Sequence, residues 1–431
     1  MGVRLSPSMI QAAIRRRSPF ALIGARLIAF LAVLGPGFIT ANVDNDPGGI
    51  LTYSQAGAQF GYTLLWTLIP TTIALIVVQE MAARMGAITG KGLSDLIREE
   101  FGLRATFFTM VVLGLADFGN IVAEFAGLAS GMAIFGVTKY IVVPLGAALV
   151  WGVVVRGRYK PVERILIIAS LIYFAYPISA FLAKPNWDRA IKQTFIPTFS
   201  SNPAYLAVIV GLIGTTITPW MQFYLQASVV EKGVDARHYG LCRLDVILGC
   251  IFTDVIAFFI VIACGATIYK AGGHTELTQA ADAAVALRPF AGKFAYLLFA
   301  VGLINASLLS AAILPLATSY NICEGLGFES GIDKRFSEAP IFYWLYSLLI
   351  GGGAASVLLI PNRLQIKLIL YSQVVNGMLL PFVLVYMLLL VNRPRLMGAF
   401  KNKRWQNAIA WATAAIMIVL SCMFVYNQVM G

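Results

Sequence analysis

Eleven long runs of apolar residues constrain this chain more than any other feature of its sequence. A helix needs about 20 consecutive, mostly apolar residues to cross a lipid bilayer. The runs cover residues 31–52, 62–83, 106–134, 139–156, 164–183, 205–230, 242–269, 291–323, 341–360, 365–391 and 407–429. Only 12% of the 431 residues are charged, against about 25% in a soluble protein. The sequence therefore predicts an all-α polytopic membrane protein, with some spans tilted, extended or broken.

The distribution of Lys and Arg predicts the orientation. If the N-terminus lies inside, 23 of the 32 Lys and Arg residues fall in cytoplasmic segments and nine fall outside, as expected for a membrane protein. We therefore expect residues 1–30 to form a cytoplasmic tail, the C-terminus to be extracytoplasmic, and the location to be a plasma membrane, in particular a bacterial inner membrane. The basic residues are scattered among short loops, so the net charge of +12 does not indicate a nucleic-acid partner.

Two of the spans contain residues that interrupt a helix. The first span contains Asp46-Pro47-Gly48-Gly49, and the sixth contains Thr218-Pro219 shortly after Gly214-Thr215-Thr216. Irregular backbone at membrane depth is tolerated where it is buried in protein or lines a cavity. Interrupted helices at matching positions of two halves point to a binding site near the bilayer midplane.

The five-span separation of the two breaks also predicts an internal repeat. An odd number of spans per repeat gives the second repeat the opposite orientation in the membrane. We expect a first five-helix repeat over residues 31–183, a second, inverted repeat over 205–391, and an eleventh helix over 407–429.

The chemistry at the two breaks favours a metal ion. A carboxylate near the bilayer centre costs about 2.5–3.5 kcal/mol or more, so Asp46 needs a compensating cation, although it could also cap the half-helix that follows. In the sixth span the candidate ligands are Thr215 and Thr218, with Met221 as an alternative. Oxygen ligands suit hard cations such as Mg²⁺ and Mn²⁺. Further polar residues near the breaks could line the ion path or face an outer vestibule: Asn42, Asp44, Asn45, Trp220 and Gln222.

Other spans contribute buried polar candidates. Asp117, Asn120 and Glu124 share one helix face, which favours an ion or proton path or a hydrogen-bond network. Asp254 is an intramembrane acid without an obvious partner, and Gln373 could complete an ion's coordination or bond to a neighbouring helix. The five cysteines lie in or beside apolar runs and form no CxxC pair, so we expect small buried side chains. No HExxH, Walker or Rossmann pattern occurs, so we expect neither an enzyme nor a resident cofactor.

Many ordered motifs resemble those of the Nramp divalent-metal transporters over nearly the whole chain. Gly35-Pro36 followed by Asp46-Pro47-Gly48 is similar to the first-helix motif GP…DPGN. Other matching segments are Gln55-Ala56-Gly57-Ala58, Thr89-Gly90-Lys91-Gly92-Leu93, Ala123-Glu124-Phe125, Lys160-Pro161-Val162-Glu163, Gly273-His274-Thr275 and Ser372-Gln373-Val374-Val375. The resemblance implies a LeuT-type fold, with two inverted five-helix repeats plus an eleventh helix, and alternating access. It also implies that Asp46 binds metal, that the Thr215 carbonyl coordinates, and that Gln373 contributes in occluded states.

The chain departs from the Nramp pattern at the positions that would set selectivity. The asparagine of the first motif is Gly49, and the metal-binding methionine of the sixth helix is Thr218. Two sixth-helix histidines appear as Trp220 and Gln226, and a third-helix aspartate appears as Ile121, whereas Glu124 is retained.

These departures favour a harder ion. Without a thioether ligand, rejection of Mg²⁺ should relax, and small side chains at Gly49 and Thr218 would leave space for a partly hydrated ion. The pattern resembles the Nramp-related magnesium transporters. We therefore expect a divalent-metal transporter for Mg²⁺, also passing Mn²⁺, without proton coupling and without an obligate protein partner. The alternatives are a proton-coupled Mn²⁺ and Fe²⁺ carrier, an Al³⁺ carrier, an amino-acid carrier of the same fold, and a non-transporting receptor or scaffold.

Overall fold

The structure is a computed structural model that describes residues 35–156, 170–200, 202–272, 277–332 and 334–430. Within these ranges the chain is helical and contains no strand. Eight of the described helices are long and apolar enough to cross a membrane. Further candidates for membrane-spanning segments are the two halves of the broken first span and two shorter apolar helices. The predicted tail, residues 1–30, lies outside the described residues, as does most of the first half of the run 164–183.

The predicted breaks in the first and sixth spans are both present. The first span consists of α3 (Pro36–Val43) and α4 (Pro47–Phe60), with Asp46 as the N-cap of α4. The sixth span consists of α11 (Pro203–Thr216) and α12 (Pro219–Glu231), with Thr218 as the N-cap of α12. A proline occupies the first turn of each second half, where its missing N–H is no loss.

The limits of three predicted spans are wrong. The second span was expected at 62–83, but α5 runs over Leu68–Thr89, because Glu80 and Arg84 lower its apolar character without ending the helix. The first span continues to Phe60 rather than to residue 52, because Ser54, Gln55 and Gln59 lower its apolar character without ending the helix. The third span was expected at 106–134, but α6 runs over Leu93–Ala133. Its first part is amphipathic and charged, and Gly102 (φ 82°) separates it from the apolar part. An apolar count detects only the second part.

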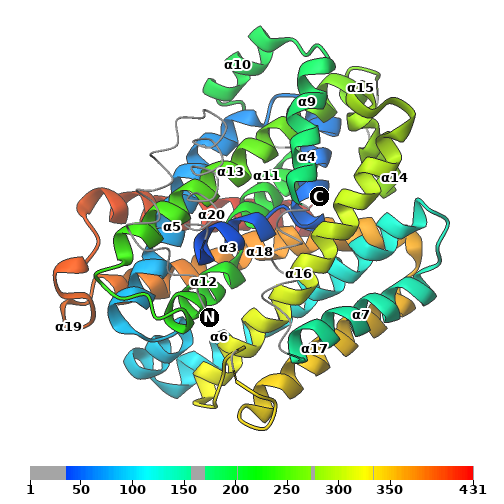
Figure 1. The fold of residues 1–431 in the computed structure, drawn as a ribbon. Helices are drawn as coiled ribbons and strands as arrows, with labels where there is room; N and C mark the ends of the chain where they lie inside the picture. Colours follow the sequence, from blue (N-terminus) through cyan, green and yellow to red (C-terminus); the bar gives the residue numbers. More distant parts are fainter. Residues whose placement is uncertain (1–34, 157–169, 201, 273–276, 333, 431) are drawn as a thin grey trace, which may run out of the picture.

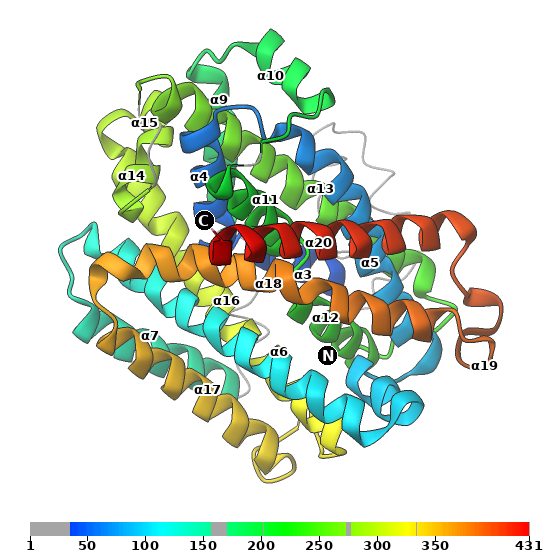
Figure 2. The same cartoon turned by 180° about the vertical axis from the view of Figure 1, so that it is seen from behind.

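The remaining helices surround the two broken spans. The longer ones are α5 (Leu68–Thr89), α7 (Lys139–Val155), α9 (Ala175–Leu182), α10 (Trp187–Phe195), α13 (Tyr239–Cys264), α16 (Ala295–Leu326), α17 (Pro340–Leu359), α18 (Asn362–Val391) and α20 (Arg404–Met430). Three short ones are α14 (Ala280–Ala284), α15 (Arg288–Ala291) and α19 (Pro394–Met397). Extensive contacts join α6 to α16, α11 to α18, and α13 to both α3 and α4. In Figure 1, α4, α11 and α18 lie toward the centre, whereas α7 and α17 lie side by side at one edge. Figure 2 shows α20 running along α18 on the opposite side.

The cysteines follow the sequence-based expectation with one correction. All five are free, and four are buried, but Cys422 on α20 is exposed. The cause is the position of α20 at the periphery, where apolar side chains face outward from the protein.

Candidate functional site

The carboxylate of Asp46 is held at the break between α3 and α4. It accepts a hydrogen bond from the backbone N–H of Gly49 at 2.6 Å, which is an N-capping interaction. The Asp46 side chain is only 5% exposed. Glu124 of α6 lies close enough to Asp46 for the two carboxyl groups to interact electrostatically, although neither Glu124 oxygen has a hydrogen-bond partner. Capping engages one Asp46 oxygen, so it is compatible with metal binding by the other.

The break in the sixth span faces the first. The hydroxyl groups of Thr215 and Thr218 are buried and have no hydrogen-bond partner, which is unusual for polar atoms inside a protein. A β-carbon added to Gly49 would lie 3.5 Å from the Thr215 hydroxyl oxygen, so the start of α4 meets the end of α11. The Thr215 hydroxyl lies at the junction with the buried Asp46 carboxylate, and the Thr218 hydroxyl lies at the start of α12. Oxygen donors of this kind suit a hard cation.

Gln373 approaches the same junction from α18. A β-carbon added to Gly48 would overlap the amide of Gln373. The Gln373 carbonyl oxygen accepts a hydrogen bond from the Asn376 amide at 3.0 Å. Asn376 and Asn120 exchange two amide hydrogen bonds, at 2.9 and 3.1 Å. A polar chain therefore connects the break in the first span, through α18, to α6.

Gly49 is not an open space in this structure, contrary to the expectation from its small size. The backbone carbonyl oxygen of Asp44 occupies the position where a Gly49 side chain would begin. The absent β-carbon lets the chain fold back on itself and bring the Asp44 carbonyl against α4. Gly49 therefore adds no space to the site.

A second group of polar residues lies beside the break. Both carboxylate oxygens of Asp44 and of Asp254 on α13 are buried without a hydrogen-bond partner, and the two groups interact electrostatically with each other. Asn45 donates a hydrogen bond to the Thr253 hydroxyl at 2.9 Å. Asp254 was expected to have no obvious partner, and the structure brings it near Asp44, a second acid that belongs to the break of the first span.

Four candidates lie away from the Asp46 carboxylate or cannot be assigned to it. Asp117 accepts a hydrogen bond from Thr318 of α16 at 3.0 Å, so it points to a different neighbour from Asn120 and Glu124. The Gln222 amide donates a hydrogen bond to the carbonyl oxygen of Thr218 at 3.1 Å. This bond stabilises the first turn of α12, next to the break. Trp220 is 2% exposed and packs near Tyr224. Asn42 lies in α3, and its side chain is not among those that the structure describes.

Sequence reasoning missed two residues that the structure brings to the junction. Tyr53 donates or accepts a hydrogen bond with Thr216 at 2.7 Å, and its hydroxyl is near enough to Asp44, Asp46 and Asp254 to interact with all three. Asn376 links Gln373 to Asn120. Its position three residues after Gln373, in an otherwise apolar span, is a signal that could have revealed it, whereas nothing in the sequence distinguishes Tyr53 from the other tyrosines.

A cavity of about 210 Å³ approaches the junction between α4, α11 and α18. Its inner lining includes Thr52 and Gly211, each one helical turn from the junction residues Gly48 and Thr215, and Val374, which adjoins Gln373. Its remaining lining includes the polar residues Gln55, Gln59, Lys367 and Tyr371.

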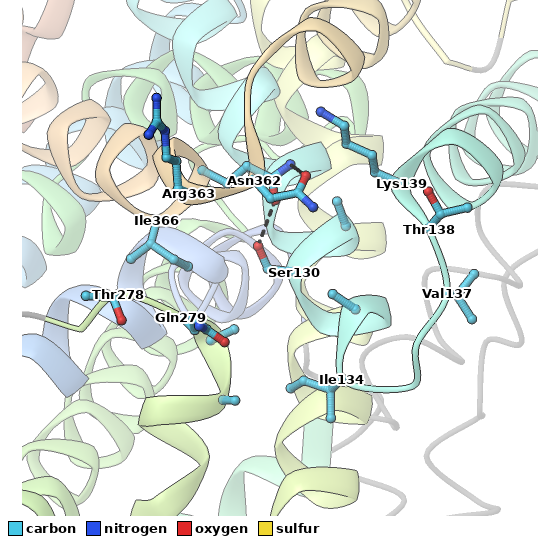
Figure 3. Close-up of a pocket in the computed structure, with 15 residues that line it drawn as sticks. Ser130, Ile134, Val137, Thr138, Lys139, Thr278, Gln279, Asn362, Arg363 and Ile366 are labelled. Carbon is cyan, nitrogen blue, oxygen red and sulfur yellow. Dashed lines mark hydrogen bonds between the residues drawn. The ribbon is translucent and has the colours of Figure 1, made fainter.

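A larger cavity, of about 400 Å³, lies elsewhere, where α6 ends and α18 begins. Figure 3 shows Ser130, Lys139 and Arg363 around it. The Lys139 ammonium group donates hydrogen bonds to the carbonyl oxygens of Val357 and Ile360 at the end of α17, so its charge is used by the helix terminus. None of the Asp46 junction residues lines this cavity.

No three His, Cys, Asp or Glu side chains converge as a metal-binding group in the described part of the chain. A metal ion carried by the protein would therefore need amide, hydroxyl, backbone or water oxygens in addition to the carboxylate of Asp46. Such ligands are characteristic of Mg²⁺ and Ca²⁺ rather than of thiolate-bound metals.

Comparison with known proteins identifies relatives of the whole chain. The family "Nramp: Natural resistance-associated macrophage protein-like" matches residues 37–427. The divalent metal cation transporter MntH of Klebsiella pneumoniae is 29% identical over 423 residues, which cover 93% of this chain and 95% of that protein. The MntH protein of Bacillus subtilis is 26% identical and covers 92% of each chain.

Solved structures show the same fold. The crystal structure of a manganese transporter from Eremococcus coleocola superposes with a TM-score of 0.74 at 22% identity, covering 92% of this chain and 87% of that one. A mutant of the same transporter has a TM-score of 0.74 over 93% of this chain. These likenesses confirm the expected LeuT-type arrangement of two inverted five-helix repeats and an eleventh helix. The chain is therefore a multi-pass membrane protein that belongs to the Nramp family.

Proposed function

We propose that this protein is a transporter of divalent metal ions that carries Mg²⁺, and also Mn²⁺, across a bacterial inner membrane by alternating access. The observation that carries the proposal is the donor set at the junction of the two breaks. Asp46 supplies a buried carboxylate, and Thr215 and Thr218 supply buried hydroxyls without protein partners. The names of the relatives as divalent metal cation transporters support the class of substrate.

The preference for Mg²⁺ rests on the residue at position 218. A threonine hydroxyl at the N-cap of α12 offers a hard oxygen where the resemblance places a methionine sulfur. Its hydroxyl makes no capping hydrogen bond, so it is available to an ion or to a water in the ion's shell. Mg²⁺ usually keeps several waters when it binds to proteins, and a threonine is smaller than a methionine.

The absence of proton coupling is proposed from three replaced residues. Trp220 is packed in the protein interior, and Ile121 is fully buried. Gln226 donates a hydrogen bond to the carbonyl oxygen of Lys91 at 2.9 Å. None of the three side chains titrates in the physiological range, so the positions that the resemblance assigns to proton carriers hold packing and bracing residues.

The orientation and the repeat limits complete the proposal. With the N-terminus inside, the cavity of about 210 Å³ opens toward the outer face, since it lies along α4 beyond the break.

We place the two inverted repeats at residues 31–183 and 205–391. The two broken helices support this division because each begins its repeat.

The alternative with independent support is a Mn²⁺ transporter that excludes Mg²⁺, since a structural neighbour is a manganese transporter. Uptake of each ion into liposomes that contain the purified full-length protein separates the two. We expect saturable Mg²⁺ and Mn²⁺ uptake, both lost in Asp46→Ala. Asp117→Asn serves as the matched control, because Asp117 is a buried acid that bonds to Thr318 instead. Robust Mn²⁺ uptake without Mg²⁺ uptake would reject the magnesium proposal.

A further inference from the structure

A pair of acids lies beside the Asp46 junction and is not used by the proposed site. Asp44 belongs to the break of the first span, whereas Asp254 belongs to the middle of α13. Asp44 is 2% exposed and Asp254 is 5% exposed. Each interacts electrostatically with the other, and Asp44 also interacts with Asp46. The fold thus brings two acids from distant parts of the sequence into one buried region.

A hydrogen-bond link holds the two chain segments together next to this pair. The Asn45 amide donates to the Thr253 hydroxyl at 2.9 Å, and that hydroxyl donates to the carbonyl oxygen of Ala41 at 2.6 Å. The residues adjoining Asp44 and Asp254 in the chain are therefore fixed to each other. The link leaves the Asn45 carbonyl oxygen buried and without a hydrogen-bond partner.

The region offers several electron-rich oxygens, and a neighbouring donor, the Thr72 hydroxyl of α5, is already used by the carbonyl oxygen of Leu68. Both oxygens of Asp44, both of Asp254 and the amide oxygen of Asn45 lack hydrogen-bond partners in the described structure. An unpartnered buried charge is strongly unfavourable, and protein interiors rarely tolerate unpartnered polar atoms. Five such oxygens from three neighbouring side chains therefore indicate a missing electropositive partner.

The charge balance shows that one ion at Asp46 does not satisfy the whole region. Four carboxyl groups lie in it: Asp44, Asp46, Glu124 and Asp254. None of them forms an ion pair with Lys, Arg or His among the described residues. A single divalent ion at Asp46 would lie beside Asp46 and Glu124, whereas Asp44 and Asp254 would remain a second pair of carboxyl groups without a cation.

We propose that Asp44, Asp254 and the Asn45 amide oxygen form a second cation-binding position for a hard divalent ion, adjacent to the ion at Asp46. This inference rests on the proposed function in that the cation is the transported metal. Two positions side by side let an ion arriving at the pair repel the ion at Asp46 and promote its release. The same donor chemistry, carboxylate and amide oxygens, accepts either Mg²⁺ or Mn²⁺.

The number of Mn²⁺ ions bound by the full-length protein in detergent tests the inference. Mn²⁺ alone is the probe, counted by equilibrium binding, and its electron paramagnetic resonance spectrum reports whether two ions lie close together. We expect two ions per wild-type chain, with line broadening from their proximity. We expect one ion in Asp254→Asn and one in Asp44→Asn, both without the broadening, and two in the control Asp117→Asn.

The outcomes separate this inference from the proposed function. One ion in the wild type, or two in a folded Asp254→Asn protein, would overturn the second position. Asp44→Asn and the wild-type count keep the test decisive if Asp254→Asn does not fold, as judged by its melting curve. A failure of Mg²⁺ uptake alone would reject the magnesium proposal and leave the count of Mn²⁺ ions unaffected. Metal-driven acidification in liposomes that disappears in Asp254→Asn would show that the pair carries protons, and would also overturn the inference.

Discussion

At the scale of single residues, the identity of residue 218 decides which ions the junction accepts. Thr218→Met would add a thioether at the N-cap of α12, at the break of the sixth span that contains Thr215. Because sulfur favours borderline metals over hard ones, we expect Mg²⁺ uptake to fall relative to Mn²⁺ uptake by about tenfold, which corresponds to about 1.4 kcal/mol. The measurement is competition between the two ions in liposomes.

The control for this substitution is Thr218→Leu, which also enlarges the side chain but adds no sulfur. If the leucine variant shifts the ratio of uptake as much as the methionine variant does, the size of residue 218 sets selectivity and ligand softness does not.

Gly49 makes a second residue-scale prediction, concerning stability. A β-carbon at this position would overlap the carbonyl oxygen of Asp44, so Gly49→Ala forces the break to shift. We expect a loss of about 1–3 kcal/mol, as for other overpacked sites, with a lower melting temperature in detergent and weaker metal binding. Gly114→Ala is the matched control, since nothing lies within 4 Å of a β-carbon there. Equal melting temperatures for the two variants would contradict the close approach of Asp44.

At the scale of elements, one buried network ties α5 to α13 and α20. Glu80 and Arg84 of α5 form an ion pair of 3.1 Å with both side chains about 5% exposed. Glu80 also accepts hydrogen bonds from Tyr239 and from Gln406, while Arg84 donates to the carbonyl oxygen of Phe400. The network lies toward the C-terminal end of α5, where the outer cavity does not reach.

Glu80→Gln tests how strongly this network joins the helices. It leaves the Arg84 charge buried without its partner, and breaking a buried pair costs about 3–5 kcal/mol. We expect a clear fall in melting temperature, partly recovered in the double variant Glu80→Gln with Arg84→Met, which removes both charges. The exposed pair of Lys91 and Glu99 provides the control, because Glu99→Gln should change stability by no more than about 1 kcal/mol. If the double variant were less stable than Glu80→Gln, the loss of stability in Glu80→Gln could not be attributed to the unpaired charge of Arg84.

The elements themselves were largely predictable from the sequence, because an apolar run of sufficient length has few alternatives to a membrane helix. The breaks were predictable as well, since Pro47 and Pro219 each follow an N-capping residue. The start of α6 was not, because charged residues around Gly102 hide the helix from an apolar count. At the site, Asp46 and Gln373 could be named from the sequence. The pairing of Asp44 with Asp254 could not, since it depends on how α13 packs against the break.

At the scale of the whole molecule, the question is whether metal movement is linked to proton movement. Alternating access in this fold requires the junction to open first to one side of the membrane and then to the other. A proton moves with the metal only if a titrating group becomes exposed to both sides during the same transport cycle. The positions expected to carry protons hold Trp220, Gln226 and Ile121, which are buried in packing or bracing roles.

We therefore expect Mg²⁺ influx into liposomes without acidification of the lumen, at a rate that an imposed pH gradient does not change. A pH-sensitive dye inside the liposomes gives the measurement, and a protonophore added at the end shows that the dye responds. Acidification that grows with Mg²⁺ concentration and is absent in Asp46→Ala would contradict uncoupled transport. Its carrier would then have to be one of the remaining buried acids near the junction, and Glu124→Gln would distinguish the acid beside Asp46 from the pair of Asp44 and Asp254. In that case the buried acids near the junction would release and take up protons as the metal moves, whereas in uncoupled influx each of them would keep the same protonation state through the transport cycle.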